Sequence, residues 1–233
     1  MDITLRHTPA VEVRVALRDL ASVAVGLAPF AVLIGVTAVR TGAGAGAGVL
    51  SSATVFGGSA QLTALAMISD GASPLAVIAA VTLVNARFLL YAAALEPGFR
   101  GQPSWFRWLA PHFVVDPSYA MVTRRPDLLE DPSRFRRYWL TAGLGLAVTW
   151  VALTAAGALL APVLPASSAL DVAAPAMFLA VLVPQLRARP ARAGAAVAAV
   201  VAATASPLPD GLGLLGGIAA GVAAATLSDR SAS

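Results

Sequence analysis

The sequence predicts an all-α membrane protein, a polytopic bundle of about seven to eight transmembrane or partly re-entrant helices, some of them broken. The first observation is composition: of 233 residues, 58% are hydrophobic and 12% are charged, whereas a soluble domain has about 25% charged residues. A chain of this size cannot bury so many apolar side chains in one aqueous core. The second observation is a series of uncharged stretches, several as long as a bilayer crossing. The third is that arginines gather at the ends of these stretches.

Eight stretches are candidates for membrane crossings. They lie at residues 20–39, 49–69, 73–95, 105–122, 138–160, 171–185, 193–205 and 211–228. The first is uncharged and about one bilayer crossing long. The second follows a GAGAGAG segment, which is typical of a flexible loop. The third begins with Ser73-Pro74, the combination of an N-cap residue and a proline that starts many helices.

The later stretches are less regular. Polar segments, EPGFRGQPS and TRRPDLLEDPSRFRR, flank the stretch 105–122, which is the weakest candidate for a full crossing. Residues 138–170 are uncharged and predict a helix to about residue 160, followed by a loop with two prolines. The stretch 193–205 is short for a crossing. The sequence contains no stretch that would form a separate soluble domain. We therefore expect a single transmembrane domain over 20–228, a cytoplasmic N-terminal segment over 1–19 and a C-terminal tail over 229–233.

The arginines predict the orientation. With the N-terminus in the cytoplasm, twelve of them fall on the cytoplasmic side, three on the outer side, and Arg87 lies within a stretch. This asymmetry is typical of a multi-pass protein of the bacterial inner membrane. If 105–122 is re-entrant, seven crossings remain and every later orientation reverses. A cleaved signal peptide is a weaker alternative, because the first apolar run and its leader are both long for one.

Composition also excludes classes of site and partner. There are no cysteines, which excludes disulfides, thiolate metal sites and cysteine nucleophiles. The histidines are His7 and His112, too few for a multi-histidine metal site, so we expect no metal and no cofactor. All 16 basic residues are arginines, and the net charge is +4. Their place at the ends of apolar runs indicates contact with a lipid bilayer, not with nucleic acid.

Polar residues within the apolar stretches are candidates for function, because polar groups in a membrane tend to be paired or functional. In FGGSAQL (56–62), two glycines allow a helix break, and Ser59 and Gln61 offer hydrogen bonds. The alternative there is close helix packing. In NARFLLY (85–91), Asn85 precedes Arg87 and Tyr91, which share a helix face. Arg87 could bind a carboxylate, or it could form a structural ion pair or reach an interface.

Two further clusters place an aspartate near a proline. In DPSYA, Asp116 before Pro117 suits the cap of a helix that restarts inside the membrane. Asp116 is also a candidate proton carrier. In DVAAPAMF, Asp171 is more typical of a helix cap than of a ligand, and Pro175 would kink the stretch. Pro29 marks an ordinary kink in the first stretch.

Four motifs, in this order, resemble those of the AzlC family, the large subunits of two-component branched-chain amino-acid exporters: VFGGSAQL, NARFLLYAAAL, DPSYA and DVAAPAMFLAVLVPQL. Members typically have a G-A/G-S-Q/A-like element after the second span, N-x-R-x-x-L-Y in the third, and D-E-S-F-A where this chain has DPSYA. The resemblance covers roughly residues 20–190. The departure is Pro117, where many relatives have Glu, so a Glu that serves coupling in those relatives would be missing here.

The resemblance implies a transport protein and not an enzyme. Its substrates would be Val, Leu and Ile, with Met as a further candidate, and the proton gradient would drive export. It also implies a small AzlD-type membrane subunit as partner, encoded separately. A channel or a structural membrane protein remains an alternative. An intramembrane serine hydrolase, with Ser59 and His112, is a weaker one, because GGSAQ lacks the small residue that usually stands directly after Ser-x in such a loop.

From these motifs we expect a substrate site and a proton-coupling group. The polar substrate-binding residues would be Ser59, Gln61, Asn85, Arg87 and Tyr91, with Phe56, Leu62 and Phe88 as the apolar wall. Coupling needs a group that changes charge within the membrane. Asp116 is our choice, and the alternatives are His112, Asp171 and Glu96. In this model the substrate carboxylate and Asp116 compete for Arg87, which requires the two side chains to lie within salt-bridge distance.

Overall fold

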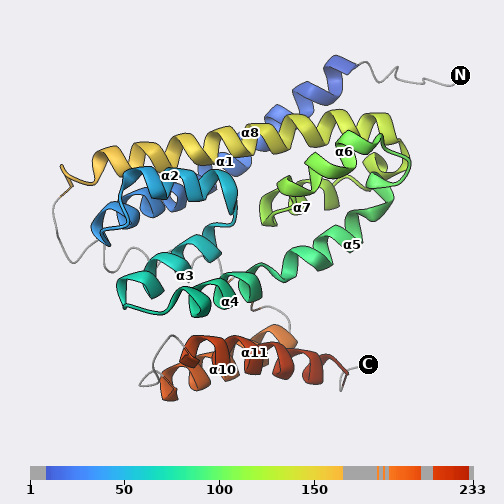
Figure 1. Ribbon diagram of the computed structural model, residues 1–233. Coiled ribbons are helices and arrows are strands. Elements are labelled where there is room, and N and C mark those ends of the chain that lie inside the picture. Colours follow the sequence, from blue (N-terminus) through green and yellow to red (C-terminus); the bar gives the residue numbers. More distant parts are fainter. Residues whose placement is uncertain (1–8, 165–182, 184–185, 187–188, 206–211, 231–233) are drawn as a thin grey trace, which may run out of the picture.

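The computed structural model describes residues 9–164, 183, 186, 189–205 and 212–230 (Figure 1). Two long helices, α1 (Pro9–Arg40) and α8 (Pro132–Leu160), pack along each other. Glycines bring their backbones together: a Cβ on Gly35 would overlap the backbone of Thr154, and one on Gly157 would overlap that of Val32. Small residues at a crossing are a common means of close helix packing in membranes. This pair is the scaffold against which the shorter helices lie.

The second apolar stretch folds as two helices with a break between them. They are α2 (Ala45–Thr54) and α3 (Gly58–Ser69), and residues 55–57 separate them. Phe56 in this break has a φ of 45°, in the left-handed region that a bulky side chain rarely adopts. Gly57 follows with an extended backbone and precedes the first turn of α3. The break that the two glycines predicted is therefore present, and it lies just before Ser59.

The third stretch is also interrupted. It forms α4 (Pro74–Asn85) and α5 (Arg87–Phe99), with Ala86 between them. The predicted start is confirmed: the Ser73 hydroxyl accepts a hydrogen bond from the Ala76 amide at 3.4 Å, with Pro74 in the first turn. Because the interruption falls at Ala86, Arg87 begins a new helix in the middle of the stretch.

The stretch 105–122 is three short helical pieces. They are α6 (Ser104–Leu109), the 3₁₀ helix η1 (Ala110–Phe113) and α7 (Asp116–Thr123). Proline has no amide hydrogen to donate, so Pro111 and Pro117 favour new helix starts at these places. The expected cap differs by one residue: Val115 precedes α7, and the Ser118 hydroxyl accepts from the Val115 amide at 3.0 Å. The carboxylate of Asp116 is thus left to bind other groups.

Helix α8 begins earlier than the charge pattern suggested. The polar segment 123–137 is expected from its charges to be an extramembrane loop, but it contains the last residue of α7, η2 (Pro126–Glu130) and the first residues of α8. Asp131 caps α8 by accepting hydrogen bonds from the amides of Ser133 and Arg134 at 2.8 and 3.1 Å. The Arg134 amide and then the Ser133 hydroxyl hold the pKa of the Asp131 carboxyl below its usual range. This cap, with Pro132 after it, sets the start of the helix.

The last two described helices, α10 (Arg189–Thr204) and α11 (Leu212–Arg230), form a closely packed pair. Gly217 and Gly221 of α11 lie against Ala198 of α10. Figure 1 shows this pair, coloured orange and red, beside α4, which α11 contacts. Most of the stretch 171–185, including Asp171 and Pro175, lies outside the described residues.

The all-α membrane fold is confirmed. Within the described part of the chain, three helical segments are long and apolar enough to cross a membrane: Ala10–Arg40, α4 and α5 taken together (Pro74–Phe99), and Pro132–Leu160. The helices α2, α3, α6 and α7 are each too short to cross alone. Short, broken helices beside long ones suit a protein in which polar backbone faces a cavity rather than lipid.

Candidate functional site

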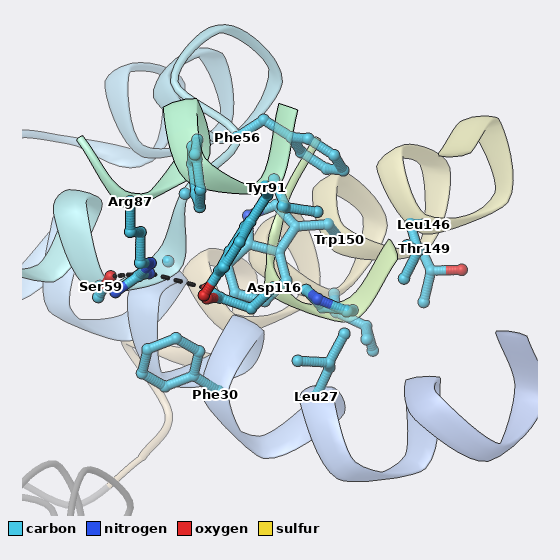
Figure 2. A pocket seen from close by; sticks show the side chains of 16 residues that line it. Leu27, Phe30, Phe56, Ser59, Arg87, Tyr91, Asp116, Leu146, Thr149 and Trp150 are labelled. Carbon is cyan, nitrogen blue, oxygen red and sulfur yellow. Dashed lines mark hydrogen bonds and ion pairs between the residues drawn. The ribbon is translucent and has the colours of Figure 1, made fainter. Parts of the chain in front are cut away.

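A cavity of about 430 Å³ lies where the broken helices meet the long pair (Figure 2). Its walls come from α1, from the break between α2 and α3, from the start of α5, from the start of α7 and from the middle of α8. The apolar lining residues are Leu27, Phe30, Phe56, Phe88, Val115, Pro117, Leu146, Trp150 and Leu153. The polar side chains on the wall are Ser59, Arg87, Tyr91, Asp116 and Thr149. A few polar groups in a mostly apolar cavity are typical of a small-molecule site.

An ion pair spans one side of the cavity. The Arg87 guanidinium lies 2.8 Å from the Asp116 carboxylate and also donates to the Ser59 hydroxyl at 2.8 Å. The Tyr91 hydroxyl donates to the other Asp116 oxygen at 3.0 Å. In Figure 2, Ser59, Arg87 and Asp116 point toward one another across the cavity. Sequence reasoning required Arg87 and Asp116 to meet, and the structure places them together.

Helix starts explain how four distant residues reach one place. Ser59 lies in the first turn of α3, Arg87 is the first residue of α5, and Asp116 is the first residue of α7. Tyr91 follows one turn after Arg87, and its ring stacks on Tyr119 at 4.3 Å between centroids. The breaks in the helices therefore place these side chains, because Ser59, Arg87 and Asp116 each lie in the first turn of a helix that begins after a break.

The start of α3 adds a favourable field for an anion. Gly57 and Gly58 lie on the cavity wall, and no side chain caps this helix start. The first amides of a helix have no partner within the helix and carry partial positive charge. Together with Arg87, they make this side of the cavity electropositive, next to the negative charge of Asp116.

Gln61 is behind the wall, not on it. It is 2% exposed, and its amide nitrogen donates to the hydroxyls of Ser51 and Ser52, both at 2.9 Å. Its carbonyl oxygen accepts from the Trp150 indole at 3.2 Å. Gln61 therefore holds Trp150, which does line the cavity. Gln61 was expected to bind the substrate directly, but it affects the cavity only through Trp150.

Asn85 and Leu62 also lie away from the cavity wall. Leu62 is a buried core residue. Asn85 packs behind the α2–α3 break, where a Cβ on Gly57 would lie 2.9 Å from its side-chain oxygen. That oxygen is buried and has no hydrogen-bond partner among the described residues. Of the expected polar set, the cavity brings together Ser59, Arg87, Tyr91 and Asp116, and of the expected apolar wall it includes Phe56 and Phe88.

Sequence reasoning missed the contribution of the two long helices. Trp150 and Leu146 of α8 and Phe30 of α1 line the cavity. Phe30 and Trp150 form a tilted aromatic pair with centroids 5.8 Å apart. A Cβ on Gly58 would lie 2.7 Å from the Trp150 ring, so a glycine is needed for this approach. The sequence around Trp150 does not mark it as a site residue, because it lies in a long uncharged run. The one indication was Gly58, a glycine that permits close approach of another group.

The two residues considered for a hydrolase have separate partners. The Ser59 hydroxyl accepts a hydrogen bond from Arg87, which makes it a poor nucleophile candidate. The His112 ring nitrogen lies 3.2 Å from the carbonyl of Ala53, and the ring stacks on Phe56. The arrangement is better suited to binding a charged group than to activating a serine.

One comparison with known proteins gives a match. The family model described as AzlC protein matches residues 22–164. This segment contains every polar side chain on the cavity wall. No curated protein and no solved structure matches the chain at a significant level.

Proposed function

Since this chain belongs to the AzlC family, we propose that it is the large subunit of a branched-chain amino-acid exporter driven by the proton gradient. Membership in this family and the long apolar helices make it a membrane protein with a role in transport. The observation that supports the substrate class is the cavity, which combines a cation, an anion and an apolar wall within one volume. Valine, leucine and isoleucine have the matching set of groups, and methionine is a further candidate.

The proposed pose uses the charges of the ion pair. The substrate carboxylate binds Arg87 and the Ser59 hydroxyl, near the uncapped start of α3. The substrate ammonium binds Asp116, beside the Tyr91 hydroxyl. The branched side chain lies among the aromatic rings of the wall, where burial of apolar surface favours binding. Gln61 and Asn85 act behind this site, through Trp150 and through the α2–α3 break.

Competition for Arg87 is the proposed coupling device. Arg87 is paired with Asp116 at 2.8 Å. A bound carboxylate would take Arg87 from Asp116, so that the substrate ammonium becomes the positive partner of Asp116. A proton then competes with this ammonium for Asp116, and protonation of Asp116 releases the ammonium, so the two flows are linked. In this chain Pro117 occupies the place of a glutamate found in many relatives, and the mechanism proposed here uses Asp116 alone.

The proposed setting is a bacterial inner membrane with the N-terminus in the cytoplasm. The distribution of arginines supports this orientation. We propose a small AzlD-type membrane subunit as the partner, with the hydrophobic amino acid and protons as the transported species. A channel or structural role remains the second candidate function, since the cavity could be a pore in a larger assembly.

Leucine flux in proteoliposomes tests the proposal. We expect vesicles that contain this chain and its small subunit to exchange labelled leucine and to move it faster when a pH gradient is imposed. The Asp116→Asn variant should retain exchange with weaker leucine binding, because an amide oxygen replaces the carboxylate beside the ammonium. It should lose the acceleration, because its amide cannot take up a proton. The chain alone should transport poorly.

The matched control is Asp70→Asn, which removes an exposed carboxylate at the end of α3. It should retain both exchange and acceleration. Passive flow of many unrelated solutes would indicate a channel, and no leucine exchange by the two subunits together would refute the proposed function. Normal gradient-driven export by Asp116→Asn would refute the role of Asp116.

A further inference from the structure

A second cavity of about 220 Å³ lies beside the first, and nothing in the proposed function uses it. It is lined by apolar side chains and by the His112 ring. Three residues belong to the walls of both cavities: Phe56, Phe88 and Val115. The two phenylalanine rings therefore form part of the partition between the cavities.

Phe56 is firmly held in this partition. Its φ of 45° is strained for a bulky residue, and such strain persists where the surroundings fix the conformation. The ring is 6% exposed, stacks on His112 at 5.6 Å and meets Phe113 edge-on at 6.3 Å. His112 is itself fixed by the carbonyl of Ala53 at 3.2 Å. A substrate side chain cannot displace this ring without disturbing all of these contacts.

Phe88 connects the partition to the charged site. The Arg87 guanidinium lies 5.3 Å from the centre of the Phe88 ring, and the ring lies 6.0 Å from that of Tyr91. An amino acid with its charged groups on Arg87 and Asp116 would begin its side chain within reach of Phe88. Phe88 is half-buried and has fewer ring contacts than Phe56.

We propose that Phe56 and Phe88 determine substrate specificity by closing off an apolar subsite that would otherwise accept an aromatic side chain. This inference rests on the proposed function. The main cavity is open at the charged groups, where Asp116 is 52% and Arg87 35% exposed. Part of the cavity volume is therefore an opening to the outside, and aromatic rings bound the space that remains for a side chain next to the charged groups. Removing one ring joins this space to the second apolar cavity of about 220 Å³, which is itself open on the side of the exposed Leu89 and His112.

The chemistry of the second cavity supports an aromatic occupant. Its walls supply the Phe56 ring, the His112 ring and aliphatic groups from Leu89, Val55 and Val114. Aromatic rings pack favourably in offset or edge-on arrangements against such walls. These walls offer no ion-pair partner to a charged side chain. Opening the second cavity should therefore change the preference between aliphatic and aromatic amino acids.

Competition between leucine and phenylalanine tests the inference. The assay is exchange of labelled leucine by this chain with its small subunit in vesicles, with unlabelled phenylalanine as competitor. We expect phenylalanine to compete weakly in the wild type and about tenfold or more better in Phe88→Ala, the range typical when an apolar pocket gains or loses bulk. Phe88→Val, tested in parallel, should give a smaller gain in the same direction.

Two further variants identify the cause. Ala92 lines only the second cavity, so adding Ala92→Leu to Phe88→Ala should refill the space and remove the gain. Phe99→Ala, also on α5, removes a ring that packs on Phe106, Phe135 and Trp139 away from both cavities. It should leave the preference for leucine unchanged.

The outcomes separate the inference from the function on which it rests. Leucine exchange with unchanged phenylalanine competition in both Phe88 variants overturns the specificity role alone. A gain that survives Ala92→Leu, or that Phe99→Ala reproduces, also overturns it, because looser packing would then be the cause. Absence of leucine exchange in the wild type overturns the proposed function and this inference with it.

Discussion

Replacing Arg87 by Gln is expected to weaken leucine binding by a factor of about 30 or more. Truncating one partner of a buried charge pair typically changes binding by about 2–5 kcal/mol, and 1.4 kcal/mol is a factor of ten. The lower end of this range applies here, because Arg87 and Asp116 are 35% and 52% exposed. Arg87 contacts Asp116 and Ser59, both at 2.8 Å, and it is the cationic side chain on the cavity wall. The measurement is the leucine concentration that gives half-maximal exchange in vesicles with the small subunit.

The control is Arg100→Gln, at the end of the same helix. Arg100 pairs with Glu96 at the same distance of 2.8 Å, but its side chain is 77% exposed. Arg100 does not line the cavity, and exposed pairs of this kind contribute only about 0–1 kcal/mol to stability. Leucine binding should therefore change less than about twofold. Equal effects of the two substitutions, or none for Arg87→Gln, would show that the charge in the cavity does not bind the substrate.

The second large effect concerns stability, at the start of the long helix pair. Glu12 of α1 is 1% exposed, and its carboxylate lies 2.8 Å from the Arg134 guanidinium of α8. Arg134 is 12% exposed and also contacts Asp127 at 2.8 Å. We expect Glu12→Ala to lower the free energy of unfolding by about 3–5 kcal/mol, because it leaves the Arg134 charge buried with one partner fewer. Unfolding in detergent micelles, followed by circular dichroism, measures this change.

Two comparisons sharpen this prediction. Glu96→Ala breaks the exposed pair with Arg100 and should lower stability by less than about 1 kcal/mol. The double variant Glu12→Leu/Arg134→Met should recover much of the loss, since apolar residues of similar size often replace a buried ion pair without penalty. A Glu12→Ala protein as stable as Glu96→Ala would mean that this pair does not hold α1 against α8.

Much of the fold follows from simple features of the sequence. Uncharged stretches of bilayer length predicted α1 and α8, and the glycines before Ser59 predicted the break between α2 and α3. The pairing of Arg87 with Asp116 could be expected because charges within a membrane need partners. The helices and the break follow from local sequence. The pairing of Arg87 with Asp116 follows from the general rule that charges within a membrane need partners.

The remaining features depend on contacts between distant parts of the chain. Gln61 has the same local pattern whether it binds substrate or, as here, supports Trp150 from 89 positions away. The cap of α7 was assigned to Asp116 instead of Val115 and Ser118, because a sequence does not show which hydroxyl or carboxylate another group will bind first. The early start of α8 was hidden by its arginines, of which Arg134 pairs with acidic groups of α1 and η2.

The most direct test of the account is whether the cavity recognises both charged groups of an amino acid. Isothermal titration of the purified chain with its small subunit would compare leucine with 3-methylbutylamine, which lacks the carboxylate, and with 4-methylpentanoate, which lacks the ammonium. Because a hydrogen bond to a charged group contributes about 1.5–3 kcal/mol, we predict that leucine binds about tenfold or more tightly than either analogue. Equal binding of leucine and either analogue would contradict the assignment of Arg87 and Asp116 as the two halves of the site.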